Sequence, residues 1–523
     1  MSKKSTTRML QGTWLLVMSS FIVKILSAIY RVPFQNMVGD EGFYVYQQVY
    51  PIYGLAVTLS LNGIPLFLSK LVAEERDFEK KQEKIQLVFW LSLLLSVALF
   101  LVFFLFSVGI AKAMGDALLS PVIRVTSFSF LLTPWLAIYR GYFQGELNVT
   151  ATAHSQLWEQ TIRVVMILIA AYWYTQASFS LYQMGAYAST GAVVGGVAAL
   201  IVLMVYRYRS QTPALLWPLK MSQKHSVEEV TKRLFTEGAL IWGYSANLMF
   251  CQFIDSFSLK NGLVAHGYLD LQAKMVKGAF DRGQPFVQVG LVIALSFVTS
   301  YLPRLTKAQQ QSSLAYQAAV RQVVKIMRVL SSAATVGLIV LLPELNRVLF
   351  GDTQETLALR LFTVIVYVLS MIQVFQMVGQ SMGQTRTLAW GLVISLVLKM
   401  TLSYPFVKWW GTVGASLSTV IAFLTSLFFL RKELYPQARQ SRAEVVPLVI
   451  ALGKMALSVI IYKKVIQVVL PALYVSRLTL FVVVLIGVLV GVVVFARSVW
   501  RAEIFTLEEW SLIPLGDKIK KKR

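Results

Sequence analysis

Residues 477–497 read RLTLFVVVLIGVLVGVVVFAR, and no charged side chain lies between the two terminal arginines. A helix rises 1.5 Å per residue, so a run of about 20 apolar residues crosses the hydrocarbon core of a bilayer. The rest of the chain has the same character: 56% of its 523 residues are hydrophobic and only 14% are charged. The mean hydropathy is +0.64. Soluble domains contain roughly 45–50% apolar residues. The sequence therefore predicts a membrane protein.

Windows of about 19 residues locate 14 apolar segments along the chain. The first of them is long and lacks a small-residue cleavage site, so we expect a retained helix and not a signal peptide. An even number of crossings places both termini on one side of the membrane. The approximate bounds of the segments are 10–30, 50–72, 85–111, 121–142, 157–174, 184–206, 234–258, 278–302, 322–343, 358–380, 388–406, 411–430, 447–469 and 477–497.

The basic residues predict the orientation. If the N-terminus is cytoplasmic, 31 of the 49 Lys and Arg residues fall in segments on the inner side. Inner loops of membrane proteins carry this excess, so we expect both termini in the cytoplasm. The same rule explains the net charge of +24 and the basic tail 518–523 without a nucleic-acid partner.

Small residues suggest an internal repeat of six spans. GYFQG at 141–145 parallels GQSMG at 379–383, and the small-residue runs 185–190 and 414–419 correspond in the same way. Six spans per repeat give two halves of equal orientation, an arrangement found in transporters. The expected fold is thus an all-α polytopic membrane protein with two six-helix lobes and two further C-terminal helices. The predicted domains are an N-lobe 1–220, a C-lobe 221–440, and a C-terminal part 441–523 with spans 13 and 14 and the basic tail.

Charged residues at membrane depth are functional candidates, because a charge is costly there unless it faces protein or a water-filled cavity. Most of them are basic, which suits an anionic ligand. Four residues near span ends, Arg31, Arg124, Arg140 and Lys277, are explained equally well by snorkelling to the headgroups and by ligand binding. The positions that snorkelling explains less well are Lys24, Arg163, Arg282 and Lys399.

The acidic residues at this depth are fewer. Glu159 and Arg163 are four residues apart on one helix face, so we expect them to neutralise each other. Asp255 has no partner at helical spacing in its own segment, and we expect it to meet Lys399, a metal ion or a proton. Asp281 is a further acid at the start of span 8.

Several enzyme classes are excluded. The single cysteine, Cys251, cannot form an internal disulfide, and three scattered histidines do not form a dense zinc site. The P-loop pattern GxxxxGK[S/T] does not occur. No segment is long enough for a soluble catalytic domain. We expect no enzymatic activity, no cofactor and no resident metal, with energy from the membrane potential or an ion gradient.

Glycine and proline predict broken helices in two spans. Gly54, Gly63 and Pro65 interrupt span 2, and Gly278, Gly283 and Pro285 interrupt span 8. Interrupted helices at membrane depth are typical of transporter sites.

Motifs on spans 1, 2, 7 and 8 carry a resemblance to a known family. They are KILSAIYRVP at 24–33, GDEG at 39–42, PIY at 51–53, IDS at 254–256 and FDRGQP at 280–285. The chain resembles the MurJ-like and stage V sporulation protein B-like branch of the multidrug/oligosaccharidyl-lipid/polysaccharide (MOP) exporter superfamily.

The resemblance implies a flippase of the bacterial cytoplasmic membrane that moves lipid II, the undecaprenyl-diphosphate-linked peptidoglycan precursor, outward by alternating access. It also implies a groove for the polyprenyl tail on the last two helices. Its partners would be the lipid-linked glycan, membrane lipids and, as a further candidate, the cell-wall synthesis machinery. Required family positions match Lys24, Arg31, Arg282, and Asp40 or Glu41. Span 2 lacks an interior arginine, however, and span 11 has Lys399 in place of an acid that helps to bind sodium.

We predict that Lys24, Arg31 and Arg282 gather around the diphosphate, since guanidinium and ammonium groups are the natural partners of phosphate oxygens. Arg163 and Lys399 are further candidates for binding the headgroup. The candidate gating or coupling residues are Asp40, Glu41, Asp255 and Asp281.

Four other functions would make different demands on this pattern. A flippase for another polyprenyl-linked glycan, such as a capsule or teichoic acid precursor, would need the same cationic site. A cationic-drug exporter would need several unpaired acids at membrane depth, where this chain has mostly bases. A membrane-embedded glycosyltransferase would need catalytic carboxylates and a substantial soluble domain, and a scaffold would need no buried bases.

Overall fold

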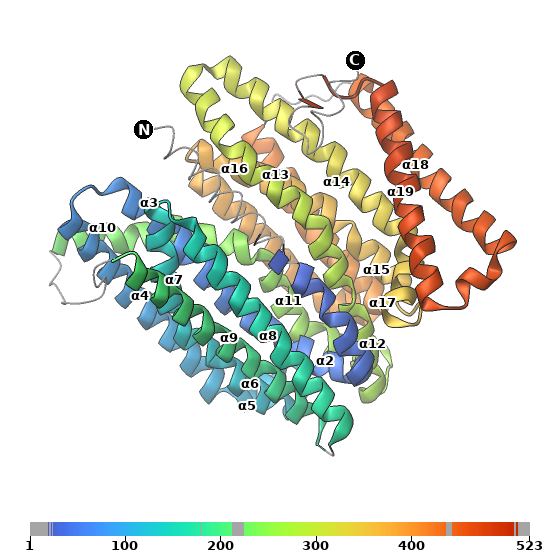
Figure 1. The fold of residues 1–523 in the computed structure, drawn as a ribbon, viewed down its shortest axis with the longest axis horizontal. Helices are drawn as coiled ribbons and strands as arrows, with labels where there is room; N and C mark the ends of the chain where they lie inside the picture. The colour runs from blue at the N-terminus through green and yellow to red at the C-terminus, as the bar shows by residue number, and fades with distance from the viewer. Residues whose placement is uncertain are drawn as a thin grey trace. The chain divides into compact units, whose positions relative to one another are not determined.

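The computed structural model describes residues 19, 22–23, 25–177, 179–211, 224–435, 442–506 and 509–510. These residues are almost entirely helical, and no strand occurs among them (Figure 1). This confirms the predicted all-α class. Two predicted features, the residue Lys24 and the basic tail 518–523, lie outside the described residues.

The helices follow one another with short connections. In chain order they are α2 (Arg31–Thr58), η1 (Leu59–Gly63), α3 (Ile64–Glu74), α4 (Phe78–Leu105), α5 (Ser107–Ala113), η2 (Ala117–Leu119), α6 (Ser120–Ser127), α7 (Ser129–Gly145), α8 (Val149–Gln176), α9 (Leu181–Arg209), α10 (Lys224–Arg233), η3 (Leu234–Gly238), α11 (Ala239–His266), α12 (Asp270–Asp281), α13 (Gly283–Gln311), α14 (Ser313–Phe350), α15 (Thr356–Thr363), α16 (Ile365–Ser381), α17 (Thr385–Leu434), α18 (Arg442–Val469), η4 (Pro471–Tyr474) and α19 (Arg477–Arg501).

The chain forms two compact units. Unit 1 comprises Met1–Asp281 with Leu396–Ala415, and unit 2 comprises Arg282–Ser395 with Ser416–Arg523. Helix α17 therefore contributes to both. The division into two repeated six-helix lobes stays a prediction.

Nine helical segments within the described residues are long and apolar enough to cross a bilayer. Two of them, Ile25–Glu74 and Thr385–Leu434, have 50 residues each, whereas one crossing needs about 20. Both contain a glycine with positive φ, Gly39 at +70° and Gly411 at +57°, where the helix kinks. The protein is thus a multi-pass membrane protein, and the count of 14 crossings stays a prediction.

The segment between the first two apolar windows is helical. Residues 31–49 belong to α2, which is kinked at Gly39. Hydropathy windows do not reveal this, because they detect apolar segments and not helices. Here the helix continues through buried polar residues such as Gln35 and Gln48.

The helices are disturbed at two of the predicted places and are regular at the others. Gly54 and Gly278 lie inside α2 and α12, which continue through them. The π-helical turn η1 precedes Pro65, which lies in the first turn of α3, so the helix is widened here but not broken. Helix α12 ends at Asp281 and α13 begins at Gly283, with Pro285 in its first turn. Proline lacks an N–H and its ring clashes with the preceding turn, so a continuous helix cannot pass through it undisturbed.

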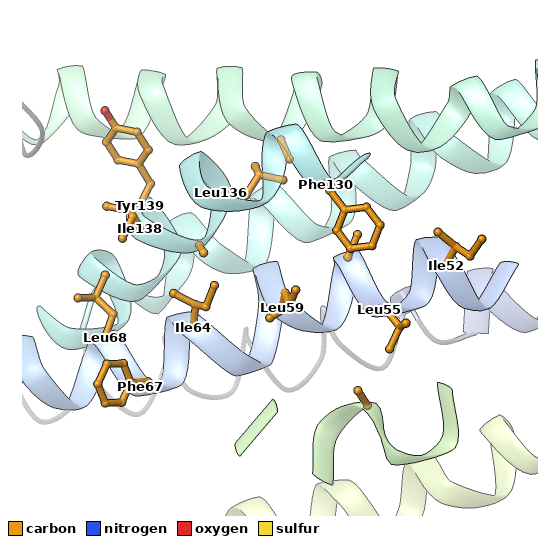
Figure 2. Packing of buried hydrophobic residues seen from close by; sticks show 14 of the residues in the cluster. Ile52, Leu55, Leu59, Ile64, Phe67, Leu68, Phe130, Leu136, Ile138 and Tyr139 are labelled. Atoms are coloured by element: carbon orange, nitrogen blue, oxygen red, sulfur yellow. The ribbon is translucent and has the colours of Figure 1, made fainter. Parts of the chain in front are cut away.

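A buried apolar cluster in unit 1 packs α2, η1 and α3 against α7 (Figure 2). Lipid tails are as apolar as these side chains, so close van der Waals packing drives this association more than removal from water does. This packing positions α2, the helix that carries Arg31 and Tyr50. Its labelled members are Ile52, Leu55, Leu59, Ile64, Phe67, Leu68, Phe130, Leu136, Ile138 and Tyr139.

Candidate functional site: a buried arginine–tyrosine cluster

Two of the predicted site residues meet inside unit 1. Arg31 is the first residue of α2, and Arg163 lies in the middle of α8; their exposed fractions are 0% and 2%. Both guanidinium carbons lie beside the ring of Tyr50, at 4.9 Å and 5.8 Å from its centroid. The fold therefore concentrates two positive charges in one buried place.

Tyrosine rings surround these two guanidinium groups. Arg163 also lies 4.6 Å from the ring centroid of Tyr53 and 5.4 Å from that of Tyr30. The residues Tyr46, Tyr50 and Tyr53 are spaced as i, i+4 and i+7 on α2, so they share one face of the helix. A desolvated cation over an aromatic face is stabilised by about 2 kcal/mol. We call Arg31, Arg163 and these four tyrosines the arginine–tyrosine cluster.

Several N–H donors in and beside this cluster have no acceptor among the described residues. None of the three guanidinium nitrogens of Arg31 has a hydrogen-bond partner among the described residues, and the same holds for Nη1 of Arg163 and Nε2 of Gln160. The other nitrogens of Arg163, Nε and Nη2, donate to Oε1 of Gln160 at 3.2 and 3.0 Å. A buried donor without a partner costs about 1–3 kcal/mol. Two permanent charges with unsatisfied donors match an anion that has several oxygens, such as a phosphate.

The predicted Glu159–Arg163 pair does not form. Glu159 instead binds Arg140 of α7, with Nη2 of the arginine 2.5 Å from Oε2 of the carboxylate. Arg140 is fully buried and also donates to Ser155 Oγ at 3.1 Å, so it does not snorkel to the headgroups. Spacing along one helix could not reveal this partner from a neighbouring helix. As a result, Arg163 has no carboxylate partner in the described part of the chain.

Glycines of α9 hold α8 in the position that this cluster requires. A Cβ added at Gly195 would lie 2.6 Å from the carbonyl oxygen of Glu159, and one at Gly191 would lie 3.0 Å from that of Arg163. The two glycines are four residues apart, the small-residue spacing that lets membrane helices approach closely. The backbone that carries Arg163 therefore packs directly on α9.

Lys399 and Asp255 form a second buried group in unit 1. Their ion pair measures 2.6 Å from Nζ to Oδ1, and Ser403 Oγ donates to the same oxygen at 3.0 Å. Of the three partners expected for Asp255, the structure shows the lysine. Within the described ranges, no cluster of three acidic, histidine or cysteine side chains could hold a metal ion. The coupling role of Asp255 stays a prediction.

The other predicted cations lie elsewhere or outside the description. Arg282 begins unit 2, where it binds Asp352 at 2.5 Å and lies 5.2 Å from the ring centroid of Phe350. Lys24 lies outside the described residues. The joint role of Lys24, Arg31 and Arg282 around one diphosphate therefore stays a prediction.

The remaining predicted acids have local partners or lie near the kink of α2. Asp281 pairs with Lys277 one turn earlier on α12, at 2.8 Å. Asp40 accepts a hydrogen bond from Nε2 of Gln35, and Glu41 is half-buried next to it. Their gating roles stay predictions.

Comparison with known proteins identifies the family to which the chain belongs. Residues 9–309 match the profile of a family described as polysaccharide biosynthesis protein. The chain belongs to this family. Its membership confirms the predicted resemblance to MurJ and stage V sporulation protein B within the MOP superfamily.

Three relatives from Bacillus subtilis (strain 168) are similar to this chain over 66–98% of its length. The uncharacterized membrane protein YabM is 34% identical over 98% of this chain and 96% of its own length. Lipid II flippase MurJ is 23% identical over 81% of this chain and 82% of its own length. Stage V sporulation protein B is 25% identical over 66% of this chain and 67% of its own length.

The fold of this chain is similar to that of a solved structure. The lipid II flippase MurJ in an inward closed conformation is 15% identical, covers 94% of this chain and 100% of its own, and aligns with a TM-score of 0.71.

Sequence reasoning missed the tyrosines of this family member's site. The signal was present, because Tyr46, Tyr50 and Tyr53 repeat at helical spacing a few turns after Arg31. Tyrosines are common in membrane helices, however, and only the approach of α8 to α2 shows that these rings face two arginines.

Proposed function

We propose that the protein is a flippase that moves lipid II from the inner to the outer leaflet of the bacterial cytoplasmic membrane by alternating access. The arginine–tyrosine cluster is the observation that carries this proposal. A diphosphate presents several oxygens and negative charge, and Arg31 and Arg163 offer matching donors and positive charge. The similarity to a relative named lipid II flippase MurJ supports the choice of substrate.

The sign of the buried charges argues against a cationic-drug exporter. Arg31 and Arg163 would repel a cation, and the nearby carboxylate of Glu159 is already bound to Arg140. A carrier for an anionic headgroup has the opposite requirement, which the cluster meets.

The membrane potential provides a driving force for this transport. An inside-negative potential favours outward movement of negative charge by about 2.3 kcal/mol per charge per 100 mV. Two uncompensated phosphate charges would gain roughly 4–5 kcal/mol per 100 mV. Any protein cation that moves with the headgroup lowers this gain.

The test is complementation in a Gram-positive host depleted of its own lipid II flippases, with outward-exposed lipid II as the measurement. Wild type should restore exposure, whereas Arg31→Ala and Arg163→Ala should not, at equal membrane abundance. Arg31→Lys keeps the charge but loses the fork of donors, so we expect partial activity. Lys464→Gln, an exposed cation on α18, is the matched control and should behave as wild type.

Two results would contradict the proposal in different ways. If wild type leaves lipid II on the inner leaflet, lipid II is the wrong substrate and a capsule or teichoic acid precursor is tested in the same way. If wild type and Arg31→Ala restore exposure equally, the arginine–tyrosine cluster is not the anion site.

A further inference from the structure

Helices α18 and α19 form a hairpin in unit 2 that packs against α14 (Figure 1). Its two apolar windows are only 22% and 28% buried. Exposed side chains such as Val449, Ile450, Leu489 and Val493 form faces that suit contact with lipid tails. Because the two helices are antiparallel neighbours, the start of α18 lies beside the end of α19.

A cavity of about 440 Å³ lies between the helices at this end. Three of the side chains that line it are cationic: Lys454 from α18, and Arg497 and Arg501 from α19. The hydroxyl of Ser498 adds a donor, while Ile450 and Val494 supply an apolar wall. Cavities of roughly 300–1,000 Å³ hold small ligands, so the space suits a lipid headgroup.

No acidic side chain among the described residues forms an ion pair with the cations of this cavity. Lys454, Arg497 and Arg501 are all exposed. Attraction to the negative end of the α19 dipole accounts for part of the preference for arginine here. The dipole of α19 does not explain why Lys454, a third cation on the other helix α18, lines the same cavity.

Aromatic side chains cluster at the C-terminal end of α19, the end of this helix that lines the cavity. The ring of Trp510 lies 5.6 Å from that of Trp500 and 5.4 Å from that of Phe505. Tryptophan gathers at the headgroup level of membrane proteins. The charge pattern of the chain predicts that this end of the hairpin faces the cytoplasm.

We propose that this cavity binds the phosphodiester of an anionic phospholipid of the inner leaflet. The phosphate would accept hydrogen bonds from Arg497 and Arg501, and the acyl chains would follow the apolar faces of α18 and α19. This site lies on other helices than the arginine–tyrosine cluster, and it does not depend on the proposed substrate. The membrane phospholipid would thus act as a bound structural lipid of the hairpin.

The test measures the lipids that remain bound to the full-length protein. The protein is reconstituted in nanodiscs of equal parts phosphatidylglycerol and phosphatidylcholine, extracted in mild detergent and examined by native mass spectrometry. Wild type should retain phosphatidylglycerol over phosphatidylcholine. In the double variant Arg497→Gln, Arg501→Gln, the preference for phosphatidylglycerol should fall about fivefold for each arginine removed. Each basic residue near an anionic surface contributes about that factor.

Two control variants distinguish binding in this cavity from a general effect of positive charge on the protein. Lys464→Gln removes an exposed cation from the same helix α18 without touching the cavity, and its lipid preference should equal that of wild type. Arg497→Lys with Arg501→Lys keeps the charge and should keep most of the preference. Lys454→Gln provides an independent single change if the double glutamine variant does not fold.

Three outcomes would overturn the proposal. One is a double variant, or Lys454→Gln, that retains phosphatidylglycerol as wild type does. Another is an equal loss in Lys464→Gln, which would indicate a diffuse charge effect. The third is retention of undecaprenyl phosphate from phosphatidylcholine nanodiscs with no retention of phosphatidylglycerol, which would assign the cavity to the transported lipid class.

Discussion

At the residue scale, two buried arginines of unit 1 differ in their hydrogen-bond and charge partners. Arg140 has a carboxylate and two further acceptors, whereas Arg163 has one amide oxygen and tyrosine rings. Both were recognisable from the sequence as cations at membrane depth. They differ because Glu159, on the same helix as Arg163, binds Arg140 of a neighbouring helix.

We expect Arg140→Gln and Arg163→Gln to separate stability from transport. Removing Arg140 leaves the carboxylate of Glu159 buried without a partner, so the protein should lose about 3–5 kcal/mol of stability. Arg163→Gln should keep the melting temperature but abolish lipid II exposure. The measurements are thermal unfolding in detergent and the complementation assay. A stable Arg140→Gln protein would show that the Arg140–Glu159 pair is not structural.

The Lys399–Asp255 pair allows a double-mutant cycle. Either Lys399→Met or Asp255→Asn alone leaves a buried charge, so each should destabilise the protein by several kcal/mol. The double variant removes both charges and should recover much of that loss, because neighbouring sites are not additive. Thermal unfolding of all four proteins measures the coupling. Purely additive losses would indicate that the two residues do not depend on each other.

At the scale of elements, the contact between α12 and α2 depends on one glycine. A Cβ at Gly278 would lie 2.2 Å from the carbonyl oxygen of Asp40, an atom of the backbone that cannot rotate away. Sequence inspection finds this glycine but cannot show what faces it, because the two helices are far apart in the chain.

Gly278→Ala should therefore destabilise the protein by about 1–3 kcal/mol, the usual cost of overpacking a tight contact. Gly453→Ala in α18 is the matched control, since nothing lies within 4 Å of its added methyl group. Thermal unfolding compares the two variants. Equal melting temperatures would show that α12 can shift away from α2 without loss.

Another contact of α12 predicts a dependence on pH. A hydrogen bond from Lys260, helped by Lys274, holds the pKa of Asp270 below its ordinary value despite the opposing effect of partial burial. A depressed pKa stabilises the folded protein above the ordinary value, and this contribution is lost as the pH falls through the folded pKa.

We expect wild type to be more stable than Asp270→Asn near neutral pH. The difference in melting temperature should shrink as the pH falls below about 4, where the carboxyl group becomes protonated. Unfolding of both proteins across that range measures it. A difference that stays constant with pH would show that Asp270 is not the group responsible.

At the scale of the whole molecule, polar contacts connect α10, α11 and α12 to the rest of unit 1. Arg233, the last residue of α10, binds Glu74 of α3 at 2.9 Å. Near the end of α11, Lys260 donates to the carbonyl oxygen of Gly115 at 2.6 Å, and Lys274 of α12 binds Asp116 at 3.1 Å. Alternating access requires the two sides of a transporter to open in turn.

A cleavable thiol crosslink between Asp116→Cys and Lys274→Cys should stop lipid II exposure, and reductive cleavage should restore it. The native Cys251 is buried, so background labelling should be low. Each single cysteine variant treated with the same reagent is the control. Full transport in the crosslinked protein would mean that these two elements move together throughout the cycle.

The sequence by itself determined the membrane location, the helical class, the helix distortions near Pro65 and Pro285 and the excess of buried cations. Each of these depends on composition or on spacing within one helix. Only the tertiary structure decided that Glu159 binds Arg140, that Lys399 binds Asp255, and that tyrosines of α2 enclose Arg163 of α8. These contacts join helices far apart in the chain, and helix packing sets their geometry, which local periodicity does not record.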